Sequence, residues 1–504
     1  MSFKEYKTLD LIKVSDHISS FWKVDKTFEK SISSRDKKEF IFYEGPPSAN
    51  GMPGIHHVMA RAIKDIFCRY KTLKGFKVNR KAGWDTHGLP IELGVEKELN
   101  ISKEDIGSKI SIKDYNEACK KAVMKYTDVW NNLTERIGYW VDMENPYITY
   151  KSKYIESVWW LLKNLHDKKL IYKGYSVQPY SPKAGTGLSS HELNQPGTYQ
   201  DITDTTVTAQ FECLEESIPN FLKKYSKIYI LAWTTTPWTL PSNTALTVGK
   251  KIEYCLIKTY NLYTHQPINV VLAKELITKV FKTNFKEVSN QDELIFNNDK
   301  EIPYIVVETF LGKDIVGMKY HQIWDDSPLP NDSPENAFRL ISGDFVTTED
   351  GTGIVHTAPT FGADDAIAAK NAKPEVPPML IKNKNGDLVP LVDLQGKFVK
   401  ELGFLGGKFV KNEYYEKGKA PERSVDVEIA IKLKEENKAF RVEKYTHSYP
   451  NCWRTDKPIL YYPLNSWFIK VTEKREELIA LNNKINWKPK STGEGRFGNW
   501  LNNA

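Results

Sequence analysis

The sequence lacks several patterns that would assign it quickly to a protein class. Its five cysteines form no Cys-x-x-Cys pair and no even set for a disulfide framework. We therefore expect reduced thiols in a cytoplasmic protein. The first residues, MSFKEYKTLDL, show no basic-then-apolar signal pattern. No window approaches the roughly eighteen uncharged apolar residues of a membrane-spanning helix, so we expect no membrane partner.

A strong imbalance of charge is absent as well. The 71 Lys and Arg residues outnumber the 64 Asp and Glu residues slightly, which gives a formal charge of +7. This balance is compatible with RNA contact, but a Lys-rich solvated surface explains it equally well. At 504 residues the chain is long enough for several domains and a well-buried core.

Three segments differ in their hydrophobic patterns. Residues 1–200 alternate strand-like and helix-like runs, which is typical of α/β proteins. Residues 201–415 contain short β-branched runs between turn residues, such as TDTTVTAQFECL and KIEYCLIKTY. Helical and mixed patterns return over 416–504. We therefore expect an α/β domain that is interrupted by an inserted β-rich domain and then resumes, truncated, at the end.

The first segment contains a strand–loop–helix pattern. IFYEGP (41–46) predicts a strand, residues 56–75 predict a helix closed by Gly75, and FKVNRKAG (76–83) predicts a second strand. Long amphipathic runs over 115–138 and 152–171 predict further helices. A parallel α/β sheet places nucleotide sites at such strand–loop–helix junctions, because the helix N-terminus offers free backbone N–H groups.

The loop after the first predicted strand reads GPPSANGMPGIHH. Glycines let a backbone approach a ligand closely, and Pro46, Pro47 and Pro53 stiffen the loop. Histidines at a helix start can donate hydrogen bonds to phosphoryl oxygens, although such a pair is also common on plain surfaces. A Gly-x-x-x-x-Gly-Lys-[Ser/Thr] run is absent, which excludes a P-loop, and the loop has no Gly-x-Gly-x-x-Gly pattern.

A second loop, GWDTHGLPIE, follows the next predicted strand. Its Asp85 can hold a substrate ammonium group, because a carboxylate pairs well with a cation. Capping of the following helix is an equally good interpretation of this residue when the loop is considered alone.

Taken together, these motifs resemble isoleucyl-tRNA synthetases, which are class I aminoacyl-tRNA synthetases. The resemblance follows the family's order and covers essentially the whole chain. It implies a Rossmann-type parallel-sheet catalytic core interrupted by a β-rich, barrel-like editing domain. The stretches that carry it are GPPSANGMP with HH and KDIFCRY, GWDTHGLPIE, AWTTTPWTLPSNTAL, GTGIVHTAPTFGADD, and HSYPNCWRTDKPILYY with SWFI.

The resemblance assigns the first loop to ATP. The family's His-x-Gly-His signature falls on Gly54-Ile55-His56-His57, so only its last histidine is kept. We expect His57 to serve the ATP phosphates and His56 to compensate in part for the lost first histidine. The ATP-binding loop would then include Gly45, Asn50, Gly51 and His57.

The resemblance also implies an isoleucine pocket and an editing site. Pro46 and Trp467 match pocket-lining positions, and Asp85 matches the carboxylate that binds the α-amino group. Core packing is the simpler interpretation of Trp467 without the family. The matched editing residues are Thr234, Thr235, Thr236, His356 and Asp365.

Asp365 is expected to bind the α-amino group of the mischarged amino acid. His356 and the threonines would shape the pocket and contact the terminal adenosine or the attacked ester. Without the family, the threonine run would indicate packing at a strand end. No Ser or Cys nucleophile lies beside a base, which favours attack by a positioned water.

The implied substrates are isoleucine, its tRNA, and ATP with Mg²⁺, bound by a cytoplasmic monomer. Some family members carry zinc in cysteine-rich knuckles. Here the matching stretches, PYSPKAGTGLSS and YPNCWRTDKP, hold one cysteine, so we expect no zinc.

The chain stops at GRFGNWLNNA, before the family's Lys-Met-Ser-Lys-Ser loop and anticodon-binding domain. We therefore expect a fragment with weak or no amino-acid activation and a complete editing insertion. Two alternatives stay open. A free-standing editing deacylase has no use for Asp85 or His57, and a non-catalytic tRNA-binding paralogue would be expected to lose Asp365 and the threonine run.

Overall fold

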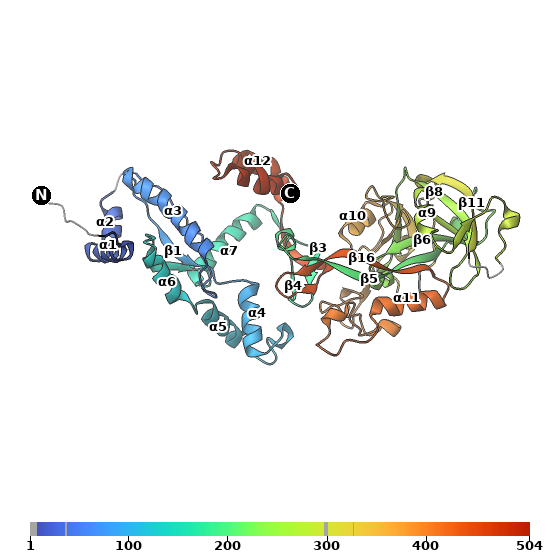
Figure 1. The fold of residues 1–504 in the computed structure, drawn as a ribbon, viewed down its shortest axis with the longest axis horizontal. Helices are drawn as coiled ribbons and strands as arrows, with labels where there is room; N and C mark the ends of the chain where they lie inside the picture. Colours follow the sequence, from blue (N-terminus) through green and yellow to red (C-terminus); the bar gives the residue numbers. More distant parts are fainter. Residues whose placement is uncertain (1–7, 36–37, 297–300, 326, 504) are drawn as a thin grey trace. The chain divides into compact units, whose positions relative to one another are not determined.

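A computed structural model describes residues 8–35, 38–296, 301–325 and 327–503. The chain divides into two compact units, which we describe separately (Figure 1). Unit 1 comprises Met1–Tyr172 and Phe468–Ala504, and unit 2 comprises Lys173–Trp467. The chain is mixed α/β with parallel strand pairs in both units, which confirms the α/β character expected from the sequence.

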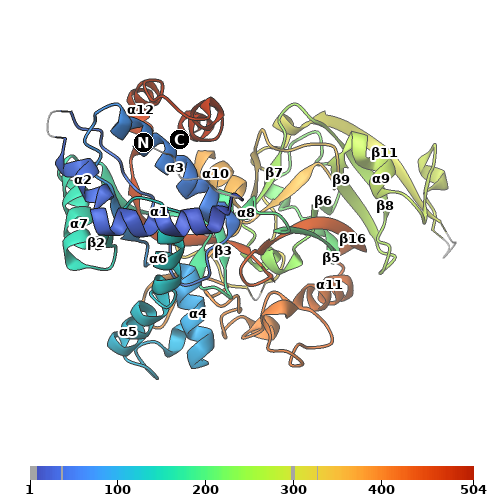
Figure 2. The same cartoon turned by 60° about the vertical axis from the view of Figure 1, so that its left-hand side comes forward.

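Unit 1 is mainly helical around one short parallel strand pair. Strand β1 (Lys81–Trp84) pairs in parallel with β2 (Asp142–Ile148). Helices α4 and α5 pack side by side (Figure 2). The helices are α1 (Leu11–Asp25), α2 (Thr27–Ser33), α3 (Ile55–Leu73), α4 (Leu89–Leu99), α5 (Ile112–Val123), α6 (Thr127–Arg136), α7 (Ser152–Asp167), α12 (Arg475–Asn482) and α13 (Phe497–Asn502).

Two sequence predictions for unit 1 are wrong in detail. The segment 41–46, expected to be a strand, forms no strand or bridge among the described residues, and the bridge between Glu39 and Lys77 lies just before it. Pro46 and Pro47 have no backbone N–H to continue a ladder. The single helix expected over 115–138 is split into α5 and α6, because the Tyr126 N–H turns away to donate to the Ala49 carbonyl at 3.0 Å.

A small apolar cluster joins the first loop to the rest of unit 1. Ala49, Trp84 and Trp130 are buried together, so the loop, β1 and α6 share one core. The Trp130 indole N–H donates to the Gly51 carbonyl at 2.9 Å. Helix α6 therefore fixes the path of the loop with both apolar contact and a hydrogen bond.

The start of the same loop is held by the buried Glu44. Its carboxylate accepts from Lys64 on α3 and from the Tyr139 hydroxyl, and its backbone carbonyl accepts from the Tyr147 hydroxyl at 2.7 Å. Burial, followed by the hydrogen bond to Glu44, raises the pKa of Tyr139, so this phenol stays a donor. These hydrogen bonds fix the position of the residue at which the loop begins.

Unit 2 is built on one large mixed sheet. Its main path runs β10-β11-β8-β9-β6-β13-β7-β12, and β5 joins it beside β6 and pairs with β16. The sheet combines parallel pairs such as β6–β9 and β7–β12 with antiparallel pairs such as β8–β9. The strands are β3 (Ile171–Ser181), β4 (Thr186–Gly187), β5 (Tyr199–Glu212), β6 (Ile228–Thr234), β7 (Ala245–Val248), β8 (Glu253–Tyr260), β9 (Pro267–Ala273), β10 (Phe285–Glu287), β11 (Ile302–Leu311), β12 (Arg339–Ser342), β13 (Ile354–Thr357), β14 (Leu380–Lys382), β15 (Leu388–Pro390), β16 (Ala439–Cys452), β17 (Lys457–Pro458) and β18 (Leu460–Ile469).

Strands β5 to β9 fall on the β-branched runs of the sequence, which confirms that these runs form strands. Strands β6 and β8 are buried almost throughout, as expected for apolar runs in a sheet interior. Helix α11 (Val425–Glu435) lies along β5 and β16 (Figure 1). The remaining helices are α8 (Ser190–Leu193), α9 (Ile277–Val280) and α10 (Ala363–Asn371). The domain limits expected at 200 and 415 stay predictions, as do the Rossmann-type core and the barrel-like form.

A buried charge cluster ties α11 to the sheet. The Lys411 ammonium lies 2.9 Å from an Asp204 carboxylate oxygen and 3.8 Å from Asp426. The other Asp426 oxygen accepts from the Trp238 backbone N–H at 2.9 Å. Burial raises the pKa of Asp426 to about 6, although Lys411 opposes the shift. Burial would lower the pKa of Lys411, but Asp426, Tyr449 and Asp204 outweigh it and raise the pKa.

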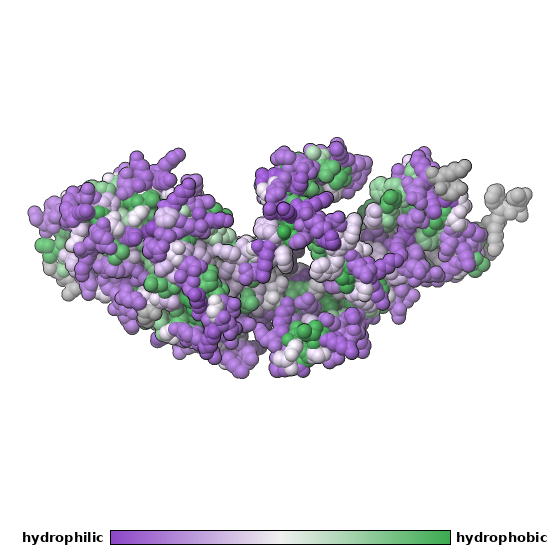
Figure 3. Space-filling view, turned by 180° about the vertical axis from the view of Figure 1, so that it is seen from behind, coloured by the Kyte–Doolittle hydropathy of each residue, from purple (hydrophilic) through white to green (hydrophobic). Residues whose placement is uncertain are grey.

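On the face shown in Figure 3, hydrophilic side chains predominate and hydrophobic ones gather in small patches. Within the described ranges, the longest and most apolar helices still fall short of what a bilayer crossing requires.

Candidate functional site

The two loops predicted to bind ATP and the amino group meet in unit 1. The Asp85 N–H donates to the Pro47 carbonyl at 3.0 Å, and the Ser48 hydroxyl donates to the Asp85 carbonyl at 2.8 Å. The Asp85 side chain is exposed, and its carboxylate has no hydrogen-bond or ion-pair partner among the described residues. Helix α4 is capped at Gly88, so helix capping by Asp85 is excluded.

His57 is oriented by the backbone of the first loop. The Gly54 N–H donates to His57 Nδ1 at 2.9 Å, and the ring lies edge-on to Trp130 with centroids 4.7 Å apart. Burial, followed by the nearby His56 and Arg61, lowers the pKa of His57. Because Nδ1 accepts, the neutral ring carries its proton on Nε2, which is free to donate to a ligand.

His56 lies against both Gly54 and His57. Its ring centroid is 3.8 Å from that of His57. A Cβ added at Gly54 would lie 2.8 Å from His56 Cε1, too close for both to remain in place. The imidazole of residue 56 therefore occupies the space beside position 54.

We expect His56→Ala to raise the pKa of His57, because the charge on His56 is one of the causes that lower it. NMR titration of the His57 ring protons measures this directly. His17→Ala removes an exposed histidine of α1 and serves as the control. An unchanged His57 titration in His56→Ala would contradict the contact.

The remaining residues predicted to bind ATP (Gly45, Asn50 and Gly51) and isoleucine (Pro46 and Trp467) are placed as follows. Gly45 and Asn50 are exposed on the loop, and Pro46 and Gly51 are partly exposed. A Cβ added at Gly45 or Gly51 would meet no atom within 4 Å, so packing does not require glycine there. Trp467 lies in unit 2 with 68% of its surface exposed, which excludes the core-packing interpretation.

In unit 2, one cavity of about 440 Å³ is lined by all five residues of the predicted editing set. Thr234 ends β6, Thr235 and Thr236 form the following turn, and His356 lies on β13. Asp365 lies in the first turn of α10. The threonines do stand at a strand end, as the simpler interpretation expected, but they also line this cavity.

The Asp365 carboxylate is held from one side only. One oxygen accepts from the Ala358 N–H at 2.8 Å. Burial raises the pKa of Asp365 to about 6, against the effect of this hydrogen bond and with a small contribution from Asp364. At neutral pH the group is an anion at the cavity wall, where a cationic ligand would be favoured.

His356 is a neutral structural residue of this cavity. Burial lowers its pKa to about 3. The Asn243 amide donates to the Ala245 carbonyl at 2.8 Å, which fixes its NH₂ group, and the same group lies 2.8 Å from His356 Nδ1. Nε2 therefore carries the proton and donates to the Thr239 hydroxyl at 3.0 Å. Both ring nitrogens are occupied, so His356 has no free nitrogen with which to act as a base.

Sequence reasoning missed the residues that hold His356. Thr239 donates onward to the Thr236 carbonyl at 2.8 Å, and Tyr320 donates to Asn243 Oδ1 at 2.7 Å. Thr239 and Asn243 lie within the motif AWTTTPWTLPSNTAL, which signals them. Tyr320 lies outside every motif, and only the fold brings it near.

The side chains that line the cavity favour binding and orientation over covalent chemistry. They include hydroxyls, aromatic rings and carboxylates, but no Ser, Cys or Lys within the part of the chain that the structure describes. His356 cannot serve the threonine hydroxyls as a base, because it is already bonded at both nitrogens. These features favour water as the nucleophile of a reaction at this site.

Comparison with known families gives a clear result. Residues 17–504 match the family described as tRNA synthetases class I (I, L, M and V). The chain belongs to this family. The loop at Gly54–His57 and the residues of the threonine-lined cavity both lie within the range that matches this family. Clusters of three or more His, Cys, Asp or Glu that could hold a metal are absent from the described ranges. The expected lack of zinc stays a prediction.

Similar proteins share one name. Isoleucine--tRNA ligase of Cytophaga hutchinsonii is 57% identical over 515 residues, covering 100% of this chain and 45% of that protein. The Bacteroides fragilis protein of that name is 56% identical, covering 99% and 44%. The Clostridium tetani protein is 41% identical, covering 99% and 42%. The chain thus spans less than half the length of these curated relatives.

Proposed function

We propose that this class I synthetase chain belongs to an isoleucyl-tRNA synthetase. The whole enzyme would use ATP, with its Mg²⁺, to form isoleucyl-adenylate and then charge the isoleucine tRNA. The names of the relatives support this assignment. The loop from Gly45 to His57, with the neutral Nε2–H of His57, would contact the ATP phosphates, and the unpaired Asp85 carboxylate would hold the substrate ammonium.

We further propose that unit 2 edits mischarged tRNA by hydrolysis. The observation that carries this proposal is the convergence of Thr234, Thr235, Thr236, His356 and Asp365 on one cavity. Asp365 would bind the α-ammonium of the amino acid, and the threonines would contact the ester or the terminal ribose. His356 would hold the threonine turn in place through Thr239, while a water attacks the ester.

An editing step answers a limit of pocket selectivity. One methylene is worth only about 1–3 kcal/mol in an apolar pocket, a range for which isoleucyl-tRNA synthetases are themselves the usual example. That difference is too small to keep valine out of an isoleucine site. The test is whether this chain, without ATP, releases valine from an isoleucine tRNA that has been mischarged with valine. No release would contradict the proposal.

We expect hydrolysis of valyl-tRNA to depend on the ionisation of Asp365. Since its pKa is raised to about 6, kcat/KM should rise about tenfold per pH unit below that value and level off above it. Initial rates from pH 5 to 8 measure the profile. The step should remain in His356→Gln, because His356 stays neutral across this range. Loss of the step in that variant, or a flat wild-type profile, would contradict the role of Asp365.

For the activation half, we propose that His56 compensates in part for the signature histidine replaced by Gly54. Support comes from the His56 ring, which lies beside Gly54 and has its centroid 3.8 Å from that of His57. Adenylate formation in the full-length synthetase should fall in His56→Ala, and unchanged formation would contradict this role. We also propose that amino-acid activation needs the regions of the relatives that this chain does not span. Near full-length rates of pyrophosphate exchange by the chain would contradict that.

A further inference from the structure

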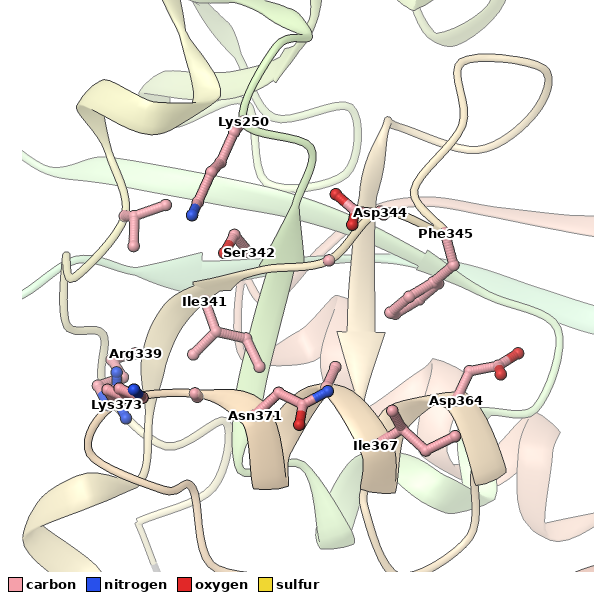
Figure 4. Close-up of a pocket in the computed structure, with 14 residues that line it drawn as sticks. Lys250, Arg339, Ile341, Ser342, Asp344, Phe345, Asp364, Ile367, Asn371 and Lys373 are labelled. Carbon is pink, nitrogen blue, oxygen red and sulfur yellow. The ribbon is translucent and has the colours of Figure 1, made fainter. Parts of the chain in front are cut away.

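A second pocket lies beside the threonine-lined cavity in unit 2 (Figure 4). Its volume is about 590 Å³, within the range of pockets that bind small molecules or nucleotide units. It lies between β12, the loop that follows it, and α10. Phe345 lines both this pocket and the threonine-lined cavity. Helix α10 turns Asp365 to the cavity and Asp364 with Ile367 to the pocket.

Three cations line this pocket, together with the carboxylates of Asp344 and Asp364. Arg339 is only 8% exposed, and its guanidinium donates to two neutral carbonyls, those of Asn336 and Pro374. Within the described part of the chain, no carboxylate lies within ion-pair distance of Arg339, Lys250 or Lys373. A buried guanidinium without a counter-ion is costly, and burial lowers the pKa of Arg339 accordingly. The pocket therefore favours an anion.

The pocket is polarised. In Figure 4, Arg339 and Lys373 lie together on one side and Lys250 extends toward Ser342, whereas Asp344 and Asp364 lie toward the side of Phe345. The two acids are exposed and would repel an anion placed beside them. Of the apolar side chains, Ile341 lies toward Arg339, and Ile367 lies beside Asp364 and below Phe345.

We propose that this pocket binds a nucleotide unit of the RNA strand whose 3′ end enters the threonine-lined cavity. The backbone phosphate lies at Lys250, Arg339 and Lys373, and the base covers the apolar floor at Ile341 and Ile367. The shared Phe345 wall places the two sites one after the other along a strand. This inference rests on the proposed editing function, because only a tRNA in the editing site brings such a strand here.

The test compares Lys250→Met/Lys373→Met with the control pair Lys251→Met/Lys370→Met. Both pairs remove two exposed lysines from the same region, but the control lysines do not line the pocket. Each lost phosphate contact on a single strand lowers the slope of log affinity against log salt by about 0.7. Because both lysines contact the same phosphate, we expect the pocket pair to lower the slope for uncharged tRNA by about 0.7 relative to the control pair. In valyl-tRNA hydrolysis, KM should rise while kcat stays unchanged.

The outcomes separate the two proposals. Equal salt slopes and equal KM in the pocket and control pairs would overturn the pocket assignment alone. If the chain does not hydrolyse valyl-tRNA but tRNA binding still depends on Lys250 and Lys373, the editing proposal fails and the RNA site stands. Titration with inorganic phosphate distinguishes a small-anion site: loss of phosphate binding in the pocket pair, with tRNA binding unchanged, would overturn the assignment to RNA.

Discussion

Asp365→Asn should lower kcat/KM for the hydrolysis of valyl-tRNA on the order of 10³-fold, measured as the release of labelled valine by this chain. Removing one member of a desolvated charge pair costs about 3–5 kcal/mol. The Asn side chain keeps an oxygen that can accept from the Ala358 N–H, so the turn that holds residue 365 should persist. The loss therefore reports the missing charge and not a collapsed site.

The matched control is Asp201→Asn. This substitution makes the same chemical change at an exposed position of β5, outside the threonine-lined cavity. It should leave the rate of hydrolysis unchanged. Circular dichroism and the urea midpoint should match in the two variants. Retained hydrolysis in Asp365→Asn, or an equal loss in Asp201→Asn, would remove Asp365 from the editing role.

The second large effect concerns stability. Lys411→Met should reduce the free energy of unfolding of unit 2 by about 3–5 kcal/mol, because it leaves buried carboxylates without their cation. Lys411 is 6% exposed in its side chain and lies near both Asp204 and Asp426. The urea midpoint at pH 8, followed by tryptophan fluorescence, measures the loss.

A pH series and a matched lysine make this prediction sharper. Lys408→Met removes a half-exposed lysine paired with Glu428 and should cost at most about 1 kcal/mol. The pKa of Asp426 is already raised to about 6 and should rise further without Lys411. A raised acid pKa favours folding at low pH, so the destabilisation by Lys411→Met should shrink from pH 8 to pH 5. Equal losses in the two variants, or no pH dependence, would contradict the cluster.

Local patterns predicted most of the elements. The β-branched runs identify β5 to β9 because a buried strand needs apolar residues over a short length, and the amphipathic run over 152–171 identifies α7. Where the predictions failed, long-range contacts prevailed over local preference. The bond from Tyr126 to Ala49 divides one expected helix into two, and no local pattern announces it.

The residues of the candidate site also divide into those that sequence motifs predict and those that only long-range contacts bring together. The threonine run and Asp365 are more than a hundred residues apart, and the family motifs, not local chemistry, predicted that they belong together. In the structure they line the same cavity. The hydrogen bond from Trp238 to Asp426 spans 188 residues and the one from Tyr320 to Asn243 spans 77, so neither was visible in the sequence. The uncompensated Arg339 likewise becomes apparent only when its surroundings are known.

We propose above all that the threonine-lined cavity removes the wrong amino acid from the isoleucine tRNA. The most direct measurement compares hydrolysis of valyl and isoleucyl esters on the same tRNA by this chain, without ATP. We predict that the valyl ester is hydrolysed faster by about tenfold or more, since one methylene is worth about 1–3 kcal/mol. Equal rates for the two esters, or hydrolysis of neither, would contradict it.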